Sequence, residues 1–152
     1  MGKALQLRGW MAATAESCTG GGIAMALTEL AGSSAWFDRG FVTYSNAAKS
    51  ELLGVEPALI ESSGAVSSEV VKAMAEGALA RSGAGVSVAV SGIAGPEGGS
   101  ELKPVGTIWI AWATRDGPVL SECFRFEGDR QQIRQQAVMA ALKGLLHASG
   151  GA

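Results

Sequence analysis

The stretch WMAATAESCTGGGIAMALTEL, residues 10–30, decides the fold of this chain. Trp10 to Thr14 are apolar or small and predict a buried strand, whereas Ile23 to Leu30 place apolar residues at helical spacing. Between them, Glu16 to Gly21 form a glycine-rich turn. The order strand, turn and helix is typical of α/β proteins.

The pattern continues along the chain. Phe41 to Tyr44 and Val86 to Val90 predict two further strands. Val105 to Thr114 has apolar residues at alternate positions, such as Ile108 and Ile110, and therefore predicts a strand. The turn residues Arg115 to Pro118 follow it, so a hairpin with Val119 to Phe126 is predicted. Helices are predicted at Ala4–Arg8, Asn46–Leu53, Pro57–Glu61, after Ser67-Ser68-Glu69, and from Asp129 to about His147. Alternating strands and helices, then one hairpin, predict a three-layer α/β domain with a mixed sheet.

Composition narrows the classes of function. The chain has 152 residues, of which 47% are apolar and 17% charged, and this balance suits one globular domain. The net charge is −2 without a basic run, so we expect no nucleic-acid partner. Neither a membrane-spanning segment nor a signal peptide is evident, so we expect a cytoplasmic protein without a membrane partner. Two cysteines and one histidine make a metal site improbable, and we expect no metal or other cofactor.

A serine, a tyrosine and a lysine fall within one short loop–strand–helix unit. Ser33 and Ser34 precede Tyr44 and Lys49, whereas the single histidine, His147, lies near the far end of the chain. A serine–histidine pair is therefore hard to build, and a lysine is the next available base for an oxygen nucleophile. The alternative is that a serine caps a turn and the lysine is solvated. From the pattern alone this alternative is favoured.

The glycine-rich turn is a candidate binding segment. Free N–H groups at the start of the following helix, together with the hydroxyls of Ser17 and Thr19, suit an anion or an oxyanion, and Gly20 and Gly21 let the backbone approach a ligand. The alternative is an ordinary strand-to-helix turn. A helix start can also activate the Cys18 thiol, but a small buried thiol fits the pattern better.

Two further segments suit a ligand. Ser91 to Gly99 is a glycine-rich loop at a strand end, where α/β sheets bind ligands. A flexible connection is an equal alternative for this loop. Arg130 and Arg134 share one face of the last helix and can hold a phosphate, although arginines in this position are usually only solvated.

Several segments of this chain form longer and more specific motifs than the patterns above. Together these motifs resemble the CinA C-terminal domain family over nearly the whole chain. The matching segments, in order, are Thr14–Gly21, Ala31–Phe37, Gly40–Asn46, Lys49, Gly64–Ser67, Ser91–Pro96 and Lys103–Thr107.

The resemblance implies a three-layer α/β/α sandwich with a mixed, mostly parallel sheet containing one antiparallel hairpin, built from residues 1–152 as a single domain. It implies hydrolysis of the carboxamide of nicotinamide mononucleotide to nicotinic acid mononucleotide and ammonia, in pyridine nucleotide (NAD) recycling, by a homo-oligomer.

The resemblance also implies site residues. Ser34 matches the nucleophile, Lys49 its base and Tyr44 an assisting tyrosine. The substrate-binding residues expected from the motifs are Ser17, Thr19, Gly20, Gly21, Ser33, Gly95, Arg130 and Arg134. Two other classes of function stay open: a nucleotide-binding module without turnover, and a competence- or damage-related interaction protein.

Overall fold

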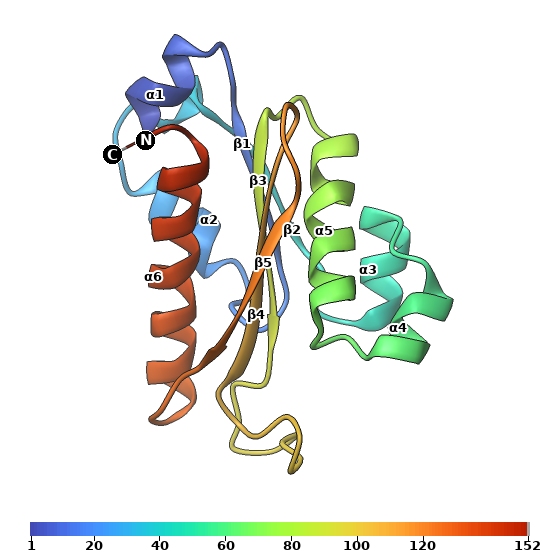
Figure 1. The fold of residues 1–152 in the computed structure, drawn as a ribbon. Coiled ribbons are helices and arrows are strands. Elements are labelled where there is room, and N and C mark those ends of the chain that lie inside the picture. The colour runs from blue at the N-terminus through green and yellow to red at the C-terminus, as the bar shows by residue number, and fades with distance from the viewer. Residues whose placement is uncertain (152) are drawn as a thin grey trace.

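The computed structural model describes residues 1–151, and it contains the predicted alternation of strands and helices (Figure 1). Its helices are α1 (Gly2–Leu7), α2 (Gly22–Thr28), α3 (Asn46–Leu53), α4 (Pro57–Ser63), α5 (Ser68–Ala80) and α6 (Arg130–Ala148), with a 3-10 turn, η1, at Ser33–Ala35. Its strands are β1 (Ala12–Glu16), β2 (Phe37–Val42), β3 (Val86–Gly92), β4 (Thr107–Thr114) and β5 (Leu120–Arg125).

The strands of residues 1–151 form one sheet in the order β2-β1-β3-β4-β5. β1 is parallel to both β2 and β3, β4 is antiparallel to β3, and β5 is antiparallel to β4. Only β4 therefore runs against the other strands, and β4 with β5 forms the expected hairpin. The predicted mixed, mostly parallel sheet is confirmed.

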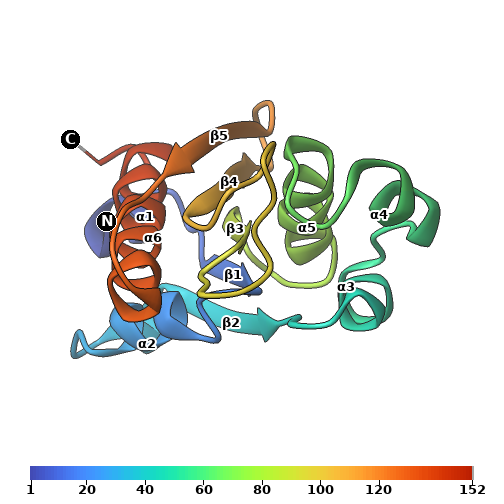
Figure 2. The same cartoon turned by 90° about the horizontal axis from the view of Figure 1, so that it is seen from below.

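Helices cover both faces of this sheet. α1, α2 and α6 lie on one face, and α3, α4 and α5 lie on the other (Figures 1 and 2). Val86, Val88 and Val90 fill the core on the α6 side, whereas alanines such as Ala89 line the α5 side. The small side chains let α5 lie close to the sheet, where the Ser87 hydroxyl donates to the Ala75 carbonyl at 2.7 Å. The predicted three-layer sandwich is confirmed.

Strand β2 differs from the sequence prediction. It begins at Phe37 and ends at Val42, rather than running from Phe41 to Tyr44. β2 is an edge strand that pairs only with β1, so its polar residues and glycine can face solvent. The run of apolar residues that usually identifies a buried strand is therefore missing from its sequence. The shift places η1 just before β2 and leaves Thr43 and Tyr44 beyond its end.

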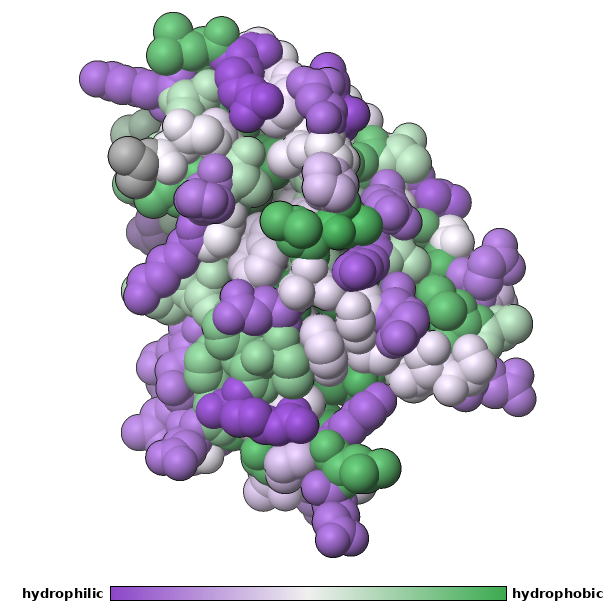
Figure 3. Space-filling view, viewed as in Figure 1, coloured by the Kyte–Doolittle hydropathy of each residue, from purple (hydrophilic) through white to green (hydrophobic). Residues whose placement is uncertain are grey.

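The other edge of the sheet is β5, which crosses the front of the molecule in Figure 1. Hydrophobic and hydrophilic residues are interspersed on this face rather than gathered by kind (Figure 3). Over the described part of the chain, the helices lack the combination of length and apolar character needed to cross a membrane.

Candidate active site

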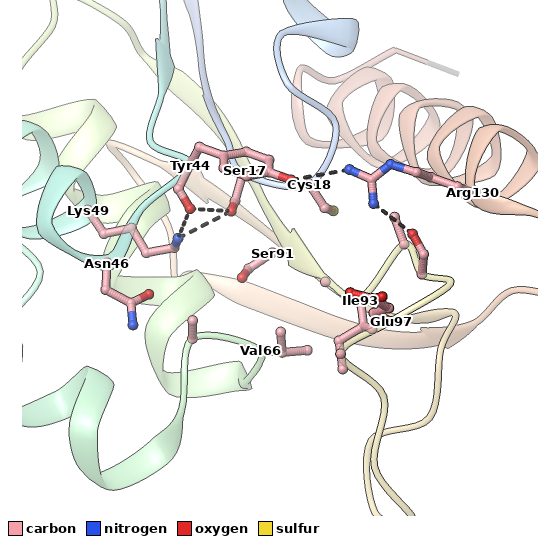
Figure 4. A pocket seen from close by; sticks show the side chains of 15 residues that line it. Ser17, Cys18, Tyr44, Asn46, Lys49, Val66, Ser91, Ile93, Glu97 and Arg130 are labelled. Carbon is pink, nitrogen blue, oxygen red and sulfur yellow. Dashed lines mark hydrogen bonds between the residues drawn. The ribbon is translucent and has the colours of Figure 1, made fainter.

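A pocket of about 290 Å³ opens beyond the carboxyl ends of the parallel strands β1, β2 and β3. Ligands bind at this position in open α/β sheets. Segments that are far apart in sequence meet there because the three strands run side by side in the same direction (Figure 4). The lining residues that matter for the chemistry are Ser17, Cys18, Tyr44, Asn46, Lys49, Ser91, Gly95, Glu97 and Arg130.

Lys49 lies at the bottom of this site, pointing at Ser17 (Figure 4). Its Nζ donates to Ser17 Oγ at 3.2 Å and to the main-chain carbonyls of Thr43 and Tyr44 at 3.1 and 3.3 Å. Lys49 lies in α3, which begins just after β2. The segment between β2 and α3 carries the two carbonyls, of Thr43 and Tyr44, that accept from its amine. A neutral amine has two N–H bonds and one lone pair. In the neutral form the two carbonyls take both N–H groups, so the lone pair faces Ser17 and the Ser17 hydroxyl becomes the donor of the 3.2 Å contact.

Burial sets the charge state of Lys49. The residue is 1% exposed and takes part in no ion pair within residues 1–151. Desolvation lowers the pKa of its amine below the ordinary value, and the neighbouring Cys18 opposes this with a smaller effect. A lowered pKa raises the fraction of neutral amine at neutral pH, which is the form that can accept a proton.

Ser17 is the first residue after β1, and its own N–H continues the sheet by donating to the Val90 carbonyl at 3.1 Å. The turn that follows is held from below by Glu16, a fully buried carboxylate. Glu16 Oε1 accepts from the Thr19 hydroxyl at 2.6 Å and from the N–H of Ile23, and Oε2 accepts from the N–H of Ala24. These bonds position the Ser17 hydroxyl on a rigid turn.

The Glu16 carboxylate occupies the start of α2. An anion or an oxyanion of the ligand was expected at this helix start, but the N–H groups of Ile23 and Ala24 bind the chain's own carboxylate instead. The Thr19 hydroxyl is likewise engaged with Glu16 rather than facing the pocket. Gly20 and Gly21 adopt φ of 60° and 104°, so they serve the turn itself and lie outside the pocket lining.

Cys18 lines the pocket beside Ser17, yet it is poorly suited to nucleophilic attack. Burial raises the pKa of its thiol to about 12. Thiolate is the reactive form of cysteine, and very little of it exists near neutral pH under these conditions. Ser17, which has a base in contact, is the better nucleophile.

The structure does not bring Ser34 to Lys49. Ser34 is exposed in η1 before β2, Lys49 follows the other end of β2, and neither Ser33 nor Ser34 lines the pocket. β2 has six residues, and at about 3.3 Å per residue its ends lie roughly 17 Å apart. The structure therefore places Ser17, and not the expected Ser34, in contact with Lys49, and the expected binding role of Ser33 is not supported.

Tyr44 reaches the site through its backbone. Its carbonyl accepts from Lys49, whereas its side chain is 61% exposed and crosses the pocket towards α6. There the phenol oxygen accepts from Arg130 Nη2 at 3.2 Å (Figure 4). The phenol thus contacts Arg130 at the mouth and not Lys49. The assisting role that the family resemblance implies for Tyr44 stays a prediction.

Arg130 is the first residue of α6 and lines the pocket, and its expected role in holding a phosphate stays a prediction. Its Nη1 donates to the Gly95 carbonyl at 2.7 Å. Gly95 has φ of 78°, and a Cβ there would approach Val105 Cγ1 to 2.5 Å, so only glycine fits. The Gly95 loop and Arg130 therefore form one wall, with a cationic group facing the opening.

Arg134 lies one turn further along α6, and its guanidinium turns inward. Nε donates to the Cys18 carbonyl at 3.1 Å and Nη2 donates to the Thr19 carbonyl at 3.2 Å. Arg134 is not among the pocket-lining residues. Its expected contact with a phosphate is therefore corrected to a contact with the turn that carries Ser17.

Sequence reasoning missed three lining residues: Asn46, Ser91 and Glu97. Ser91 and Glu97 belong to the glycine-rich loop region that was recognised only as a segment. Asn46 was considered only as a possible helix cap. Their position is the signal that could have identified them, since Ser91 lies near the carboxyl end of β3 and Asn46 and Glu97 follow the carboxyl ends of β2 and β3.

Metal ions in proteins are bound by clusters of side chains. Within residues 1–151, no group of three or more His, Cys, Asp or Glu side chains is placed to hold a metal ion. The expectation that no metal takes part stays a prediction.

Comparison with known proteins gives a consistent result. The sequence model of the CinA C-terminal domain matches residues 1–149. The chain is 58% identical over 146 residues to nicotinamide-nucleotide amidohydrolase PncC from Enterobacter agglomerans, covering 96% of this chain and 89% of that protein. It is 62% identical over 134 residues to the protein of the same name from Pseudomonas putida, covering 88% and 82%.

Solved structures agree with the sequence relatives. The crystal structure of the competence/damage inducible protein CihA from Agrobacterium tumefaciens matches with a TM-score of 0.94 at 50% identity, covering 97% of this chain and 90% of that one.

Proposed function

Because the chain belongs to the CinA C-terminal domain family, we propose that it is an amidohydrolase that converts nicotinamide mononucleotide to nicotinic acid mononucleotide and ammonia, in pyridine nucleotide recycling. The observation that carries the proposal is the 3.2 Å contact between Lys49 Nζ and Ser17 Oγ at the bottom of a pocket. The pocket volume of about 290 Å³ suits one small ligand.

The reaction begins with proton transfer from Ser17. Neutral Lys49 takes the hydroxyl proton as Ser17 Oγ attacks the carboxamide carbon. The lowered pKa of the Lys49 amine makes its neutral form available, and the two carbonyls that it contacts orient its lone pair. The product of this step is a tetrahedral intermediate with a negatively charged oxygen.

Two backbone N–H groups can receive that oxygen. The N–H groups of Cys18 and Thr19 find no acceptor within residues 1–151, although both residues are buried. Buried N–H groups without partners are rare in folded proteins, so an orphan pair beside a nucleophile supports an oxyanion hole. Removing one such donor typically slows catalysis about 10²–10³-fold.

The intermediate then breaks down. The Lys49 ammonium gives its proton to the amide nitrogen, the C–N bond breaks, and ammonia leaves an acyl ester on Ser17. Water attacks this ester with Lys49 again as base, which releases the acid and restores the Ser17 hydroxyl. Ser17 and Lys49 are the reacting groups that the pocket supplies in this sequence, and water is the second nucleophile.

The phosphate of the substrate is best placed at the mouth. Arg130 is charged, exposed and hydrogen-bonded to the Tyr44 phenol, so the two side chains together offer donors to a phosphate without moving the catalytic pair. Phosphate recognition here leaves the carboxamide end to reach Ser17.

Ammonia release from nicotinamide mononucleotide by the purified protein tests the proposal directly. Wild type is expected to turn the substrate over, Ser17→Ala is expected to lose turnover while staying folded, and Ser34→Ala is the matched serine control with wild-type rates. Full loss in Ser34→Ala and full activity in Ser17→Ala would restore the assignment based on sequence. Binding of the nucleotide without ammonia release would favour the non-catalytic module.

The homo-oligomer expected from the resemblance remains part of this proposal. Light scattering of the purified chain across concentrations measures it independently of the chemistry.

A further inference from the structure

Resting on the proposed function, we propose that Arg134 is a positioning residue that orients and polarises the Cys18–Thr19 peptide as an oxyanion donor. The residue acts through the backbone and does not touch the substrate. The structural observation is a guanidinium on α6 that binds the two carbonyls of the turn directly after the nucleophile.

Both contacts fall on the same short segment. Arg134 Nε and Nη2 donate to the carbonyls of Cys18 and Thr19, at 3.1 and 3.2 Å, so a rigid planar group grips two successive peptides. Gly20 makes this approach possible, because it has φ of 60° and a Cβ there would lie 3.3 Å from Arg134 Nη2. A side chain at position 20 would be strained by its backbone and would press on the guanidinium.

The direction of the N–H follows from the peptide plane. In a trans peptide the C=O and the N–H point to opposite sides. The Cys18 carbonyl points towards Arg134 on α6, so the Thr19 N–H points away from α6. α6 and α3 lie on opposite faces of the sheet, and α3 carries Lys49 (Figure 2). The N–H is therefore directed to the side on which Lys49 contacts Ser17.

The charge of Arg134 adds to this orientation. A cation on the carbonyl of a peptide polarises it and makes its N–H a stronger donor, as in other hydrogen-bond chains of low dielectric. Glu16 holds the same turn from the other side through Thr19 and the start of α2. Glu16 and Arg134 thus hold the turn between them, and of the two only Arg134 binds the carbonyl of the Cys18–Thr19 peptide.

The first experiment compares Arg134→Gln, Arg134→Lys and wild type on nicotinamide mononucleotide and on nicotinamide riboside, which lacks the phosphate. Lys143→Gln is the control, since it removes an exposed charge from the same helix. We expect Arg134→Gln to lower kcat for both substrates by the same factor, about 10²–10³ for a weakened oxyanion donor, with KM little changed. Arg134→Lys keeps the charge but loses the planar grip, so its loss should be smaller.

The pH profile separates positioning from a change in the base. In the proposed mechanism kcat/KM rises with pH as the Lys49 amine loses its proton. The midpoint of this rise should be the same in Arg134→Lys as in wild type, because the base is unchanged. Guanidinium ion added to Arg134→Ala should restore part of the lost rate, and a variant damaged only in its fold would not respond in this way. A KM that rises for the mononucleotide alone would instead assign Arg134 to the phosphate and overturn the inference.

A second readout is independent of the substrate. A fluorophosphonate probe reacts when Ser17 Oγ attacks phosphorus and fluoride leaves, with the hydroxyl proton passing to Lys49 and the phosphoryl oxygen in the oxyanion hole. We expect rapid labelling of Ser17 in wild type and in Lys143→Gln, and slow labelling in Arg134→Gln. If wild type is labelled but releases no ammonia, the proposed function fails and the inference stands. Equal labelling of Arg134→Gln and wild type, or no labelling of wild type, would overturn the inference.

Discussion

Lys49 Nζ and Ser17 Oγ lie 3.2 Å apart although the two residues are separated by 32 positions in the chain. Ser17 follows β1 and Lys49 follows β2, and these strands are neighbours that run in parallel. Their carboxyl ends therefore meet at one edge of the sheet. The position of the pocket is a consequence of strand direction, and the mechanism that we propose depends on this one contact.

The contact predicts strongly non-additive mutations. Ser17→Ala and Lys49→Ala should each lower kcat by about 10³-fold or more, and the double variant should be little worse than either alone, since the two groups act as one unit. Steady-state kinetics of the three variants measure this. A double variant whose loss equals the product of the single losses would mean that the residues act separately.

A pH dependence follows from the lowered pKa of Lys49. The neutral amine is the active form, so kcat/KM should rise with pH through a midpoint below the ordinary lysine value of about 10.4. Lys49→Arg should lose this limb together with activity, because arginine stays protonated. A pH–rate profile of both proteins is the measurement. An active Lys49→Arg with an unchanged profile would remove Lys49 as the base.

The same burial has a cost in stability. The folded state lowers the pKa of Lys49, so between that lowered value and the ordinary value the unfolded chain binds more protons than the folded one. Stability therefore rises with pH across this window and is reduced below it. Lys49→Met should be inactive yet more stable than wild type at neutral pH, with the difference shrinking towards pH 10. Denaturant unfolding at several pH values measures it, and a less stable Lys49→Met at neutral pH would contradict the argument.

Arg130 should act on affinity rather than on chemistry. Arg130→Gln is expected to raise KM for nicotinamide mononucleotide by roughly tenfold, the effect of losing a charge-assisted bond of about 1.5 kcal/mol, with kcat much less affected. Nicotinamide riboside should be converted equally well by both proteins. Arg125→Gln, an exposed arginine outside the pocket, is the control. Equal KM values for wild type and Arg130→Gln would place the phosphate elsewhere.

Glu16 should matter for stability as well as for activity. Glu16→Gln replaces one carboxylate oxygen by an NH₂ group that faces a backbone N–H, so a loss of about 1–3 kcal/mol in unfolding free energy is expected. Glu29→Gln, at the exposed end of the same helix α2, should be neutral. Chemical denaturation compares the two, and equal stability of both variants would show that the buried carboxylate does not hold the turn.

Much of the fold is readable in the sequence because its signals are local. The glycine-rich turn after Trp10–Thr14, the hairpin turn at Arg115–Pro118 and the capping box at Asp129 each act within a few residues. The bounds predicted for β2 were wrong because an edge strand does not need a continuous apolar pattern. Lys49, which the family resemblance singled out as a base, does line the pocket, but its role stays a prediction.

The partner of that lysine required the tertiary structure. Ser34 is nearer to Lys49 in sequence than Ser17 is, but an extended strand lies between them and carries the two to opposite ends of the sheet. Arg134 looked like a phosphate ligand beside Arg130, yet it turns inward to the Ser17 turn. The sequence by itself determined most of the elements and the sheet type, because these follow from neighbouring residues. Only the tertiary structure decided which serine contacts Lys49 and which arginine lines the pocket, because parallel strands bring together strand ends that no local pattern relates.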